Sequence, residues 1–442
     1  MRIHTRLTLG ALALLALGVR GVAAEQNQFG SASLLPLPTV NEPPVEVARN
    51  QSAVGRPRLT NFRAETQEQV PTPANGHAEG SDYNNAMQNN GWGDDCGSCL
   101  PTACGPRWFG GIYGLYMTRD RENNLCLTVD EFASGGTGDQ VLKSREASMD
   151  WAGGAEVRVG RTFCDSCYGW EAVYWGIYEN GEEASVFQSD YAGNMVTSRR
   201  LDDLNLGADN VGTQHFDTAA MHRLERNYEF QNVEINLLRI PGCGYTSGCG
   251  GCGNCGTGFT AGGTFGVRYF RFDEDFLYSS DQDLTWGNDP DDEAHYLVDV
   301  ENHLIGLQLG AQANYNMNCR WGFFTDLKFG AYANYMTQSQ SVRDGAGNYA
   351  TVNNGPFNGD EYNFESDKDD FAFLGELRLG VNYQITQRWR AVAAYRALAV
   401  TGVALSPDQV PDYFYDMAEA QQIKSSGSLI LHGFQLGVEC NF

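Results

Sequence analysis

The chain has 442 residues, a formal net charge of −25, 52 glycines, 12% aromatic residues and a mean hydropathy of −0.39. This acidity argues against binding to nucleic acid, and against binding to anionic surfaces without bridging cations. Beyond the N-terminal region no run reaches the about eighteen consecutive apolar residues of a membrane-spanning helix, which excludes a helical membrane protein.

Residues 1–24 predict a secretory signal peptide. Arg2 and Arg6 precede an apolar run, Leu7–Val19, and small residues suitable for cleavage follow at Val22–Ala24. The apolar run is too short to cross a membrane as a helix. We therefore expect the mature chain to be exported.

Residues 25–107 differ in composition from the rest of the chain. They contain nine of the 14 prolines, are rich in Asn, Gln, Ala and Ser, and show no sustained hydrophobic period. Such a composition buries too little apolar surface to offset the entropy lost on ordering. We expect a flexible periplasmic segment here.

From Trp108 onward, apolar and polar residues alternate with a period of two, which places one set on each face of a β-strand. In the clearest run, 371–385, most odd positions are apolar and even positions include Glu376 and Arg378. The last run ends on the aromatic residue Phe442, as outer-membrane barrel proteins commonly do. The pattern predicts ten strands, at about 108–118, 153–164, 168–179, 225–240, 258–276, 294–317, 321–341, 370–385, 389–403 and 427–442.

The connections between these strands alternate in length. Short turns at 165–167, 318–320 and 386–388, with a glycine- and cysteine-rich one at 241–257, alternate with long loops at about 119–152, 180–224, 277–293, 342–369 and 404–426. This is the wiring of a bacterial outer-membrane barrel with short periplasmic turns and long outer loops. A secreted β-sandwich or lipocalin-like barrel would explain the alternation, but not its combination with export and the terminal aromatic strand. The predicted fold is therefore all-β: a transmembrane antiparallel up-and-down β-barrel over 108–442. About ten strands form it, and hairpins within 119–152 or 180–224 would raise the number to twelve or more.

Two stretches carry a further signal: WFGGIYGLYMTRD at 108–120, which opens the barrel, and YRALAVTGVALSPDQVP at 395–411, before the last strand. Both resemble the outer-membrane β-barrel porin family of planctomycete-type bacteria, and the resemblance covers residues 108–442. It implies an outer-membrane location and a pore for passive diffusion of small solutes or ions, and it marks no catalytic residue. The expected partners are outer-membrane lipid and the barrel-assembly machinery, which would recognise the C-terminal strand ending in Phe442. The sequence shows no signature of an oligomeric state.

Charged residues of both signs occupy the inferred inward face. In a wide barrel such residues tune ion selectivity, whereas in a narrow one they pair and fill the interior. Eight strands leave room for side chains alone and sixteen to eighteen leave a channel, so about ten strands lie near the closed end. A closed barrel acting as a surface scaffold or adhesin therefore stays open as the alternative to a pore. The inward set is Glu156, Arg158, Glu234, Arg268, Asp326, Lys328, Glu376, Arg378, Arg390, Arg396 and Glu439.

Twelve cysteines in an exported chain predict structural disulfides, because the periplasm is oxidising. Cys126 lies near the outer end of the first hairpin, and the other eleven fall at the periplasmic rim. The run from Cys249 to Cys255, with Cys243 before it, could instead hold a metal or an iron–sulfur cluster, but its spacing departs from the ferredoxin patterns. Spacing leaves the pairing of the cysteines open. The disulfide candidates are Cys96, Cys99, Cys104, Cys164, Cys167, Cys243, Cys249, Cys252, Cys255, Cys319 and Cys440.

Acidic residues concentrate in two outer segments. Residues 273–293 contain nine acidic residues and no basic one, and residues 360–370 contain six acidic residues against Lys368 alone. The simplest interpretation is a solvated surface. Cation attraction to a pore mouth and calcium-bridged loops are the functional alternatives.

An enzyme is not predicted, although an outer-membrane enzyme is a further alternative, and neither a cofactor nor a metal site is predicted. His215 and His222 flank Asp217 in an outer loop, and His295 and His303 lie near the start of a strand. The chain contains no Gly-x-Ser-x-Gly motif, and no serine–histidine–acid set can be assigned by spacing.

Overall fold

The computed structural model describes residues 107–120, 124–131, 138–163, 166–191, 193–207, 210–217, 219–240, 258–318, 320–386 and 388–442. The chain divides into two units, Met1–Asn89 and Asn90–Phe442, and all described residues belong to the second. The predicted signal peptide, and the predicted periplasmic segment apart from Arg107, lie outside the described residues.

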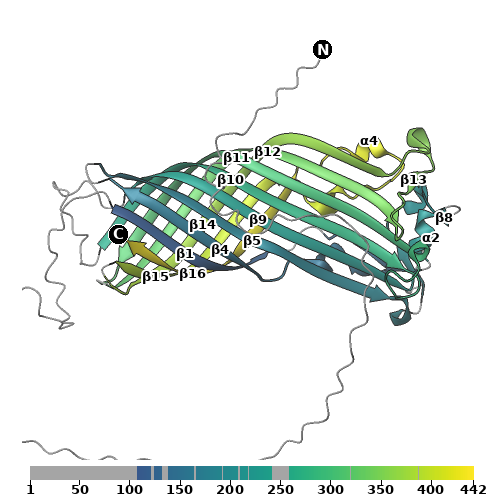
Figure 1. Cartoon of the computed structure of the whole chain (residues 1–442), viewed down its shortest axis with the longest axis horizontal. Helices are drawn as coiled ribbons and strands as arrows, with labels where there is room; N and C mark the ends of the chain where they lie inside the picture. The colour runs from purple at the N-terminus through teal and green to yellow at the C-terminus, as the bar shows by residue number, and fades with distance from the viewer. Residues whose placement is uncertain are drawn as a thin grey trace, which may run out of the picture. The chain divides into compact units, whose positions relative to one another are not determined.

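Ten antiparallel strands close into a barrel (Figure 1). Each strand pairs with its neighbours along the chain, and β1 closes the ring against β16, where Trp108 and Phe442 exchange two backbone hydrogen bonds of 2.9 Å. The predicted fold and the number of ten strands are confirmed. The barrel strands are β1 (Arg107–Arg119), β4 (Ala152–Thr162), β5 (Tyr168–Phe187), β9 (Met221–Arg239), β10 (Gly258–Asp281), β11 (Glu293–Asn316), β12 (Trp321–Asp344), β14 (Asn363–Gln384), β15 (Trp389–Val403) and β16 (Gly427–Asn441).

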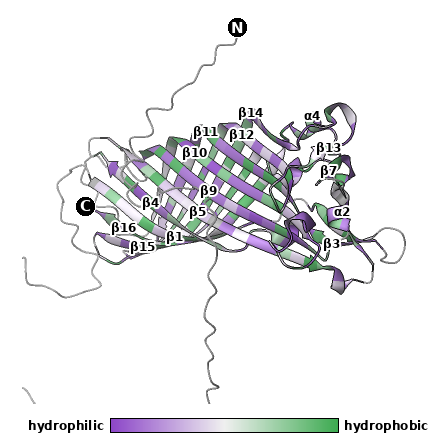
Figure 2. Cartoon of the chain, turned by 45° about the vertical axis from the view of Figure 1, so that its right-hand side comes forward, coloured by the Kyte–Doolittle hydropathy of each residue, from purple (hydrophilic) through white to green (hydrophobic). Residues whose placement is uncertain are grey.

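A band of apolar residues surrounds the barrel at its periplasmic part. On β10 every outward-facing position from Phe259 to Tyr269 is apolar or small. About nine to eleven residues of tilted strand cross the hydrocarbon once, so this stretch spans the lipid. Hydrophobic and hydrophilic residues alternate along the strands in Figure 2, as such a wall requires.

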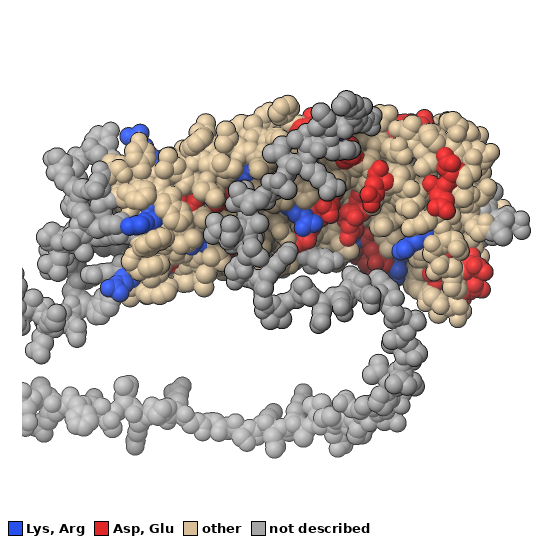
Figure 3. All heavy atoms as spheres, turned by 45° about the horizontal axis from the view of Figure 1, so that its top comes forward, with Lys and Arg blue, Asp and Glu red and all other residues tan. Residues whose placement is uncertain are grey.

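The strands continue beyond the lipid band, toward the long loops. On β10 the outward positions become Arg271, Asp273 and Asp275, while the inward residues Phe276 and Tyr278 are fully buried. In Figure 3 acidic side chains gather on the barrel surface nearer the loop-bearing end. Outward acids make part of these extensions look like loops in the sequence, as at the start of β14, where Glu365, Asp367 and Asp369 break the lipid-facing half of the pattern. The predicted loops 180–224, 277–293 and 342–369 are too long: β5 ends at Phe187, β9 begins at Met221, β10 ends at Asp281 and β14 begins at Asn363.

The outer loops fold into small elements of their own. One three-stranded sheet contains β2 (Cys126–Asp130), β3 (Asp139–Lys143) and β6 (Met195–Thr197), and another contains β7 (Leu204–Leu206), β8 (Asn210–Val211) and β13 (Thr351–Val352). No strand of either sheet joins the barrel ring, so the described parts of 119–152 and 180–224 leave the ring at ten strands. The helical elements are α2 (Gly212–Asp217), α3 (Ser406–Gln409) and α4 (Met417–Ala420), with single turns η1 (Ser144–Ala147), η2 (Gln188–Asp190), η3 (Leu201–Asp203), η4 (Pro290–Asp292) and η5 (Gly355–Phe357).

Among the described residues, no helix has the length and apolar character needed to span a membrane.

Candidate functional site in the barrel interior

The barrel interior contains two hydrophobic clusters. The outer core joins loop residues such as Leu204 and Phe216 to wall residues such as Tyr278, Tyr296 and Val298. The middle core lies on the inner faces of the barrel strands, and its aromatic members include Trp175, Phe230, Phe270 and Phe272, each 0% exposed. Large buried side chains therefore occupy the interior at two levels.

Glu274 connects the loops to the wall. Its carboxylate accepts hydrogen bonds from Arg226, from Arg119 Nη1 at 3.3 Å and from the backbone N–H of Ser406 at 3.0 Å. Arg226 also donates to the carbonyl oxygen of Ser144 at 3.0 Å. These contacts join β1, β9 and β10 to the loop segments that carry η1 and α3. We call Glu274, Arg119 and Arg226 the loop anchor.

Below the middle core, toward the periplasmic end, lies a charged layer of four acidic and four basic side chains. They form a continuous series of ion pairs across the interior, and Arg396 also lies 5.3 Å from the centre of the Trp175 ring, which joins this layer to the middle core. The pairs are Glu171–Arg158 (3.3 Å), Arg158–Glu156 (3.1 Å), Glu156–Arg396 (2.5 Å), Arg396–Glu376 (3.1 Å), Glu376–Arg268 (2.6 Å), Arg268–Glu234 (3.4 Å) and Glu234–Lys328 (2.6 Å).

The charged layer is neutral overall, because its four carboxylates match its four cations. Amide side chains add hydrogen bonds to it: Gln308 donates to Glu234 at 2.8 Å, and Asn236 donates to Glu171 at 3.1 Å. Buried charges of this kind are tolerated only when each is paired and hydrogen-bonded. The layer thus occupies part of the interior without an excess of either charge.

The structure places all eleven residues of the predicted inward set on the inner side of the barrel. Seven belong to the charged layer. The other four pair nearer the periplasmic mouth, Asp326 with Arg378 at 3.1 Å and Arg390 with Glu439. The inward set omits Glu171, although this residue holds an inward position in the alternation of Tyr168–Phe187. The period of two could have found it.

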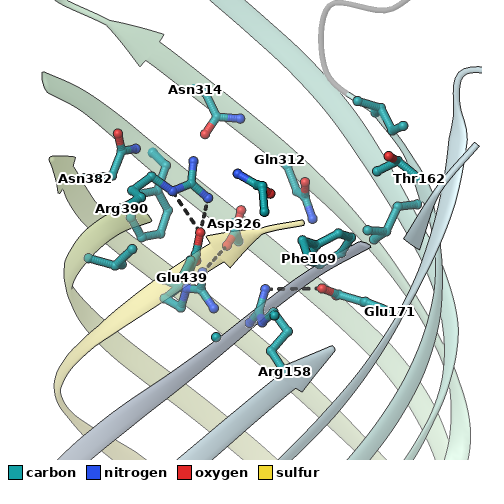
Figure 4. Close-up of a pocket in the computed structure, with 18 of the residues that line it drawn as sticks. Phe109, Arg158, Thr162, Glu171, Gln312, Asn314, Asp326, Asn382, Arg390 and Glu439 are labelled. Atoms are coloured by element: carbon teal, nitrogen blue, oxygen red, sulfur yellow. Dashed lines mark hydrogen bonds and ion pairs between the residues drawn. The ribbon is translucent and has the colours of Figure 1, made fainter. Parts of the chain in front are cut away.

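A pocket of about 390 Å³ opens at the periplasmic mouth of the barrel (Figure 4). Its wall combines the paired charges just described with the amides of Gln312, Asn314 and Asn382 and with the rings of Phe109 and Phe324. All ten barrel strands contribute residues to it from their periplasmic parts. No local sequence pattern indicates this pocket, because its members are far apart along the chain.

The described cysteines divide into bonded and free. Cys167 is disulfide-bonded, whereas Cys126 and Cys440 are free thiols. The prediction of a disulfide at Cys440 is therefore wrong. The Cys440 side chain lies on the outward face of β16, where the residue is in register with Trp389. Of the other candidates, none is described: Cys96, Cys99, Cys104, Cys164, Cys243, Cys249, Cys252, Cys255 and Cys319 all lie outside the described residues. Within the described ranges, no three His, Cys, Asp or Glu side chains are placed to hold a metal.

The four histidines noted in the sequence make structural contacts in the outer part of the barrel, and three of them lie on barrel strands, His222 on β9 and His295 and His303 on β11. His222 is fully buried, and His215 Nε2 lies 3.4 Å from the carbonyl oxygen of Leu206. His295 contacts Ser279 Oγ at 2.9 Å and Glu293 Oε2 at 3.3 Å, which is a serine–histidine–carboxylate arrangement. Ser279 is 0% exposed, however, so a substrate cannot reach its hydroxyl in this conformation. Asp217 accepts a bond from the backbone N–H of Thr197, and His303 pairs with Glu301 on the outer surface.

Several solved barrels are similar to this chain. They include the outer-membrane protease OmpT from Escherichia coli (12% identity, 76% of this chain and 97% of that chain, TM-score 0.38). A major outer membrane protein from Thermus thermophilus is also similar (12% identity, 76% of this chain and 99% of that chain, TM-score 0.28). So is the P. putida toluene transporter TodX (10% identity, 76% of this chain and 90% of that chain, TM-score 0.24). Likeness at these identities and scores carries no argument about activity. No curated protein matches the chain.

A family match covers most of the barrel. The family described as "Putative beta barrel porin-7 (BBP7)" matches residues 131–442. The match contains nine of the ten barrel strands, every strand of the two loop sheets except β2, and every residue of the charged layer. The chain therefore belongs to this family of β-barrel porins.

Proposed function

We propose that this protein is an outer-membrane barrel closed across its lumen, which serves as a surface scaffold or adhesin by holding folded outer loops above the membrane. The observation that supports this most directly is the filled interior. The charged layer, the middle core and the outer core follow one another along the barrel axis and are built from buried side chains. These side chains occupy the space that a diffusion channel would need.

Passive diffusion of small solutes or ions is the second candidate. Membership in a porin family favours it, and the periplasmic pocket would serve as a vestibule. Conduction would require the loops and the two hydrophobic cores to separate from the wall. Because the charged layer has no net charge, an opened lumen would select weakly between cations and anions.

We expect the refolded full-length protein to be silent in planar lipid bilayers. The measurement is single-channel conductance at high salt and high protein load, with a general-diffusion porin as the positive control. Folding is verified by the shift in gel mobility between heated and unheated samples, so that silence cannot come from unfolded protein. Steady, stepwise conductance events at low voltage would contradict the closed barrel and support the diffusion pore.

The outer-membrane setting also belongs to this proposal. Export through the predicted signal peptide at 1–24 rests on the sequence. Recognition of the last strand by the barrel-assembly machinery is supported by the place of Phe442, whose backbone pairs with Trp108 while its side chain is 67% exposed. The lipid band of outward apolar residues supports direct contact with membrane lipid.

A further inference from the structure

The pocket at the periplasmic mouth has the size of a small-molecule site. Its volume of about 390 Å³ falls within the range of about 300–1,000 Å³ that such sites occupy. The lining residues Gln312, Asn314 and Asn382 are half-buried, which leaves their amides within reach of a ligand. Figure 4 shows them on the inner side of the barrel, Gln312 and Asn314 on β11 and Asn382 on β14.

The charged side chains of the pocket are already committed to one another. Arg378 pairs with Asp326 at 3.1 Å, and Arg158 pairs with Glu171 at 3.3 Å. Arg390 pairs with Glu439, to which the Tyr113 hydroxyl also donates. Three cations and three carboxylates balance, so a charged ligand meets no net attraction and would have to displace an existing partner. This favours a neutral ligand.

The amides of the pocket are the groups with hydrogen-bonding capacity to spare. Within the described residues the side chains of Asn314, Asn316 and Asn382 make no hydrogen bond, and Gln312 donates a single bond to Thr264 Oγ1 at 3.2 Å. Each amide offers two donors and a carbonyl acceptor. Hydroxyl groups both donate and accept, so several hydroxyls on one ligand would match this set.

The geometry around Gly322 places two of these amides together. A Cβ atom at Gly322 would lie 2.9 Å from Asn382 Oδ1 and 3.0 Å from Asn316 Oδ1. Because glycine carries no side chain, the amides of β11 and β14 can approach one another across β12. The amides of Asn316 and Asn382 therefore lie close together on the pocket wall.

Aromatic rings supply the apolar part of the wall. Phe109 on β1 and Phe324 on β12 both line the pocket and are half-buried, and the Arg378 guanidinium covers Phe324 at 5.1 Å from its ring centre. Sugar rings carry apolar C–H faces that pack on aromatic rings, together with hydroxyls at their edges. We propose that this pocket binds an uncharged polyhydroxylated ligand, a small saccharide. The proposal goes beyond the scaffold function and does not depend on whether the lumen opens.

The test is whether a neutral saccharide binds saturably to the refolded full-length protein. Binding is measured by calorimetric titration. The detergent must carry no sugar headgroup, because a glucoside or maltoside would compete for the pocket. Maltose and N,N′-diacetylchitobiose are the two probes: the first represents a free nutrient sugar and the second represents the glycan of the cell wall. Gluconate and glucosamine are charged probes of similar chemistry, and we expect both to bind at least tenfold more weakly than a neutral saccharide.

Asn314→Ala and Asn382→Ala are each expected to weaken saccharide binding by about three- to tenfold, the effect of losing one or two hydrogen bonds. Asn358→Ala, at an exposed position in an outer loop, is the matched control and should leave binding unchanged. The proposal is overturned if neither neutral probe binds to protein of verified fold. It is also overturned if both pocket variants bind as the wild type does, or if a charged probe binds more tightly than the neutral ones.

Discussion

Replacing Glu274 with glutamine is expected to release the outer loops from the barrel wall while the membrane-spanning part stays folded. The Glu274 carboxylate lies between Arg119 and Arg226, and the side chains of all three are almost completely buried. Removing one member of such a buried ion group leaves uncompensated charge, which typically costs about 3–5 kcal/mol. The same carboxylate accepts the backbone N–H of Ser406, so the segment that carries α3 loses a fixed contact as well.

Limited trypsin digestion measures this release. Arg200 is an exposed cleavage site beside η3, and its rate of cleavage should rise when the loop anchor is weakened. Glu225→Gln is the matched control, because Glu225 lies on the outer surface of β9 and its pair with Arg223, at 2.6 Å, is partly exposed. Such a surface pair contributes at most about 1 kcal/mol. Equal digestion of the two variants would show that Glu274 does not hold the loops.

Acidification is expected to destabilise the outer core through His222. The His222 ring is buried, with Nε2 donating to the carbonyl oxygen of Phe216 at 2.7 Å and Nδ1 within 2.8 Å of Thr128 Oγ1 and 3.1 Å of Tyr278 Oη. Burial lowers the pKa of His222 from 6.5 to about 4, although the Phe216 carbonyl opposes this shift. The folded protein therefore holds this histidine neutral in a pH range where the unfolded chain would protonate it.

The direction of the pH effect follows from that difference. Below about pH 6.5 the unfolded chain binds a proton at His222 that the folded protein does not bind. The contribution of His222 to the free energy of unfolding is therefore fully present above this pH and decreases as the pH falls to about 4. A pKa difference of this size corresponds to a loss of about 3 kcal/mol. Asp273 and Asp299 act in the opposite sense, because burial raises the pKa of each to about 7 and both then bind protons more readily in the folded protein.

A comparison of variants isolates the contribution of His222. Urea unfolding of the wild type and of His222→Gln is measured at several pH values from about 7.5 to about 4.5, which bracket the titration of the unfolded histidine. Glutamine can still donate to the Phe216 carbonyl but does not titrate. The difference in free energy of unfolding between the wild type and His222→Gln should therefore decrease as the pH falls. His303→Gln, on the outer surface, should keep the pH dependence of the wild type. Parallel curves for the wild type and His222→Gln would exclude this role for His222.

The alternation of apolar and polar residues predicted the barrel. It arises because each strand faces lipid on one side and a polar interior on the other. It failed where the outward side left the lipid, as at the start of β14, where Glu365, Asp367 and Asp369 are exposed. The outer core was also not predicted. Its loop residues, such as Leu204 and Phe216, are apolar, which is not expected of a loop exposed to water. Apolar residues inside long outer loops are therefore a signal of a filled barrel.

The inward charges could be found by alternation, but their pairing could not. Glu156 and Arg396 are 240 residues apart, and Glu376 and Arg268 are 108 apart, so no local pattern relates them. The pocket was hidden for the same reason, because it joins the periplasmic ends of strands from both halves of the barrel. Strand register, set by the closed ring, determines both.

The long sequence separation within the charged layer has a consequence for assembly. A single hairpin entering the bilayer carries inward charges whose partners lie on strands not yet placed, and unpaired charge in hydrocarbon costs several kcal/mol. Glu156 on β4 meets Arg396 on β15 only after β1 has joined β16. Insertion strand by strand would thus be opposed until the ring is complete, so we expect closure of the barrel to be cooperative.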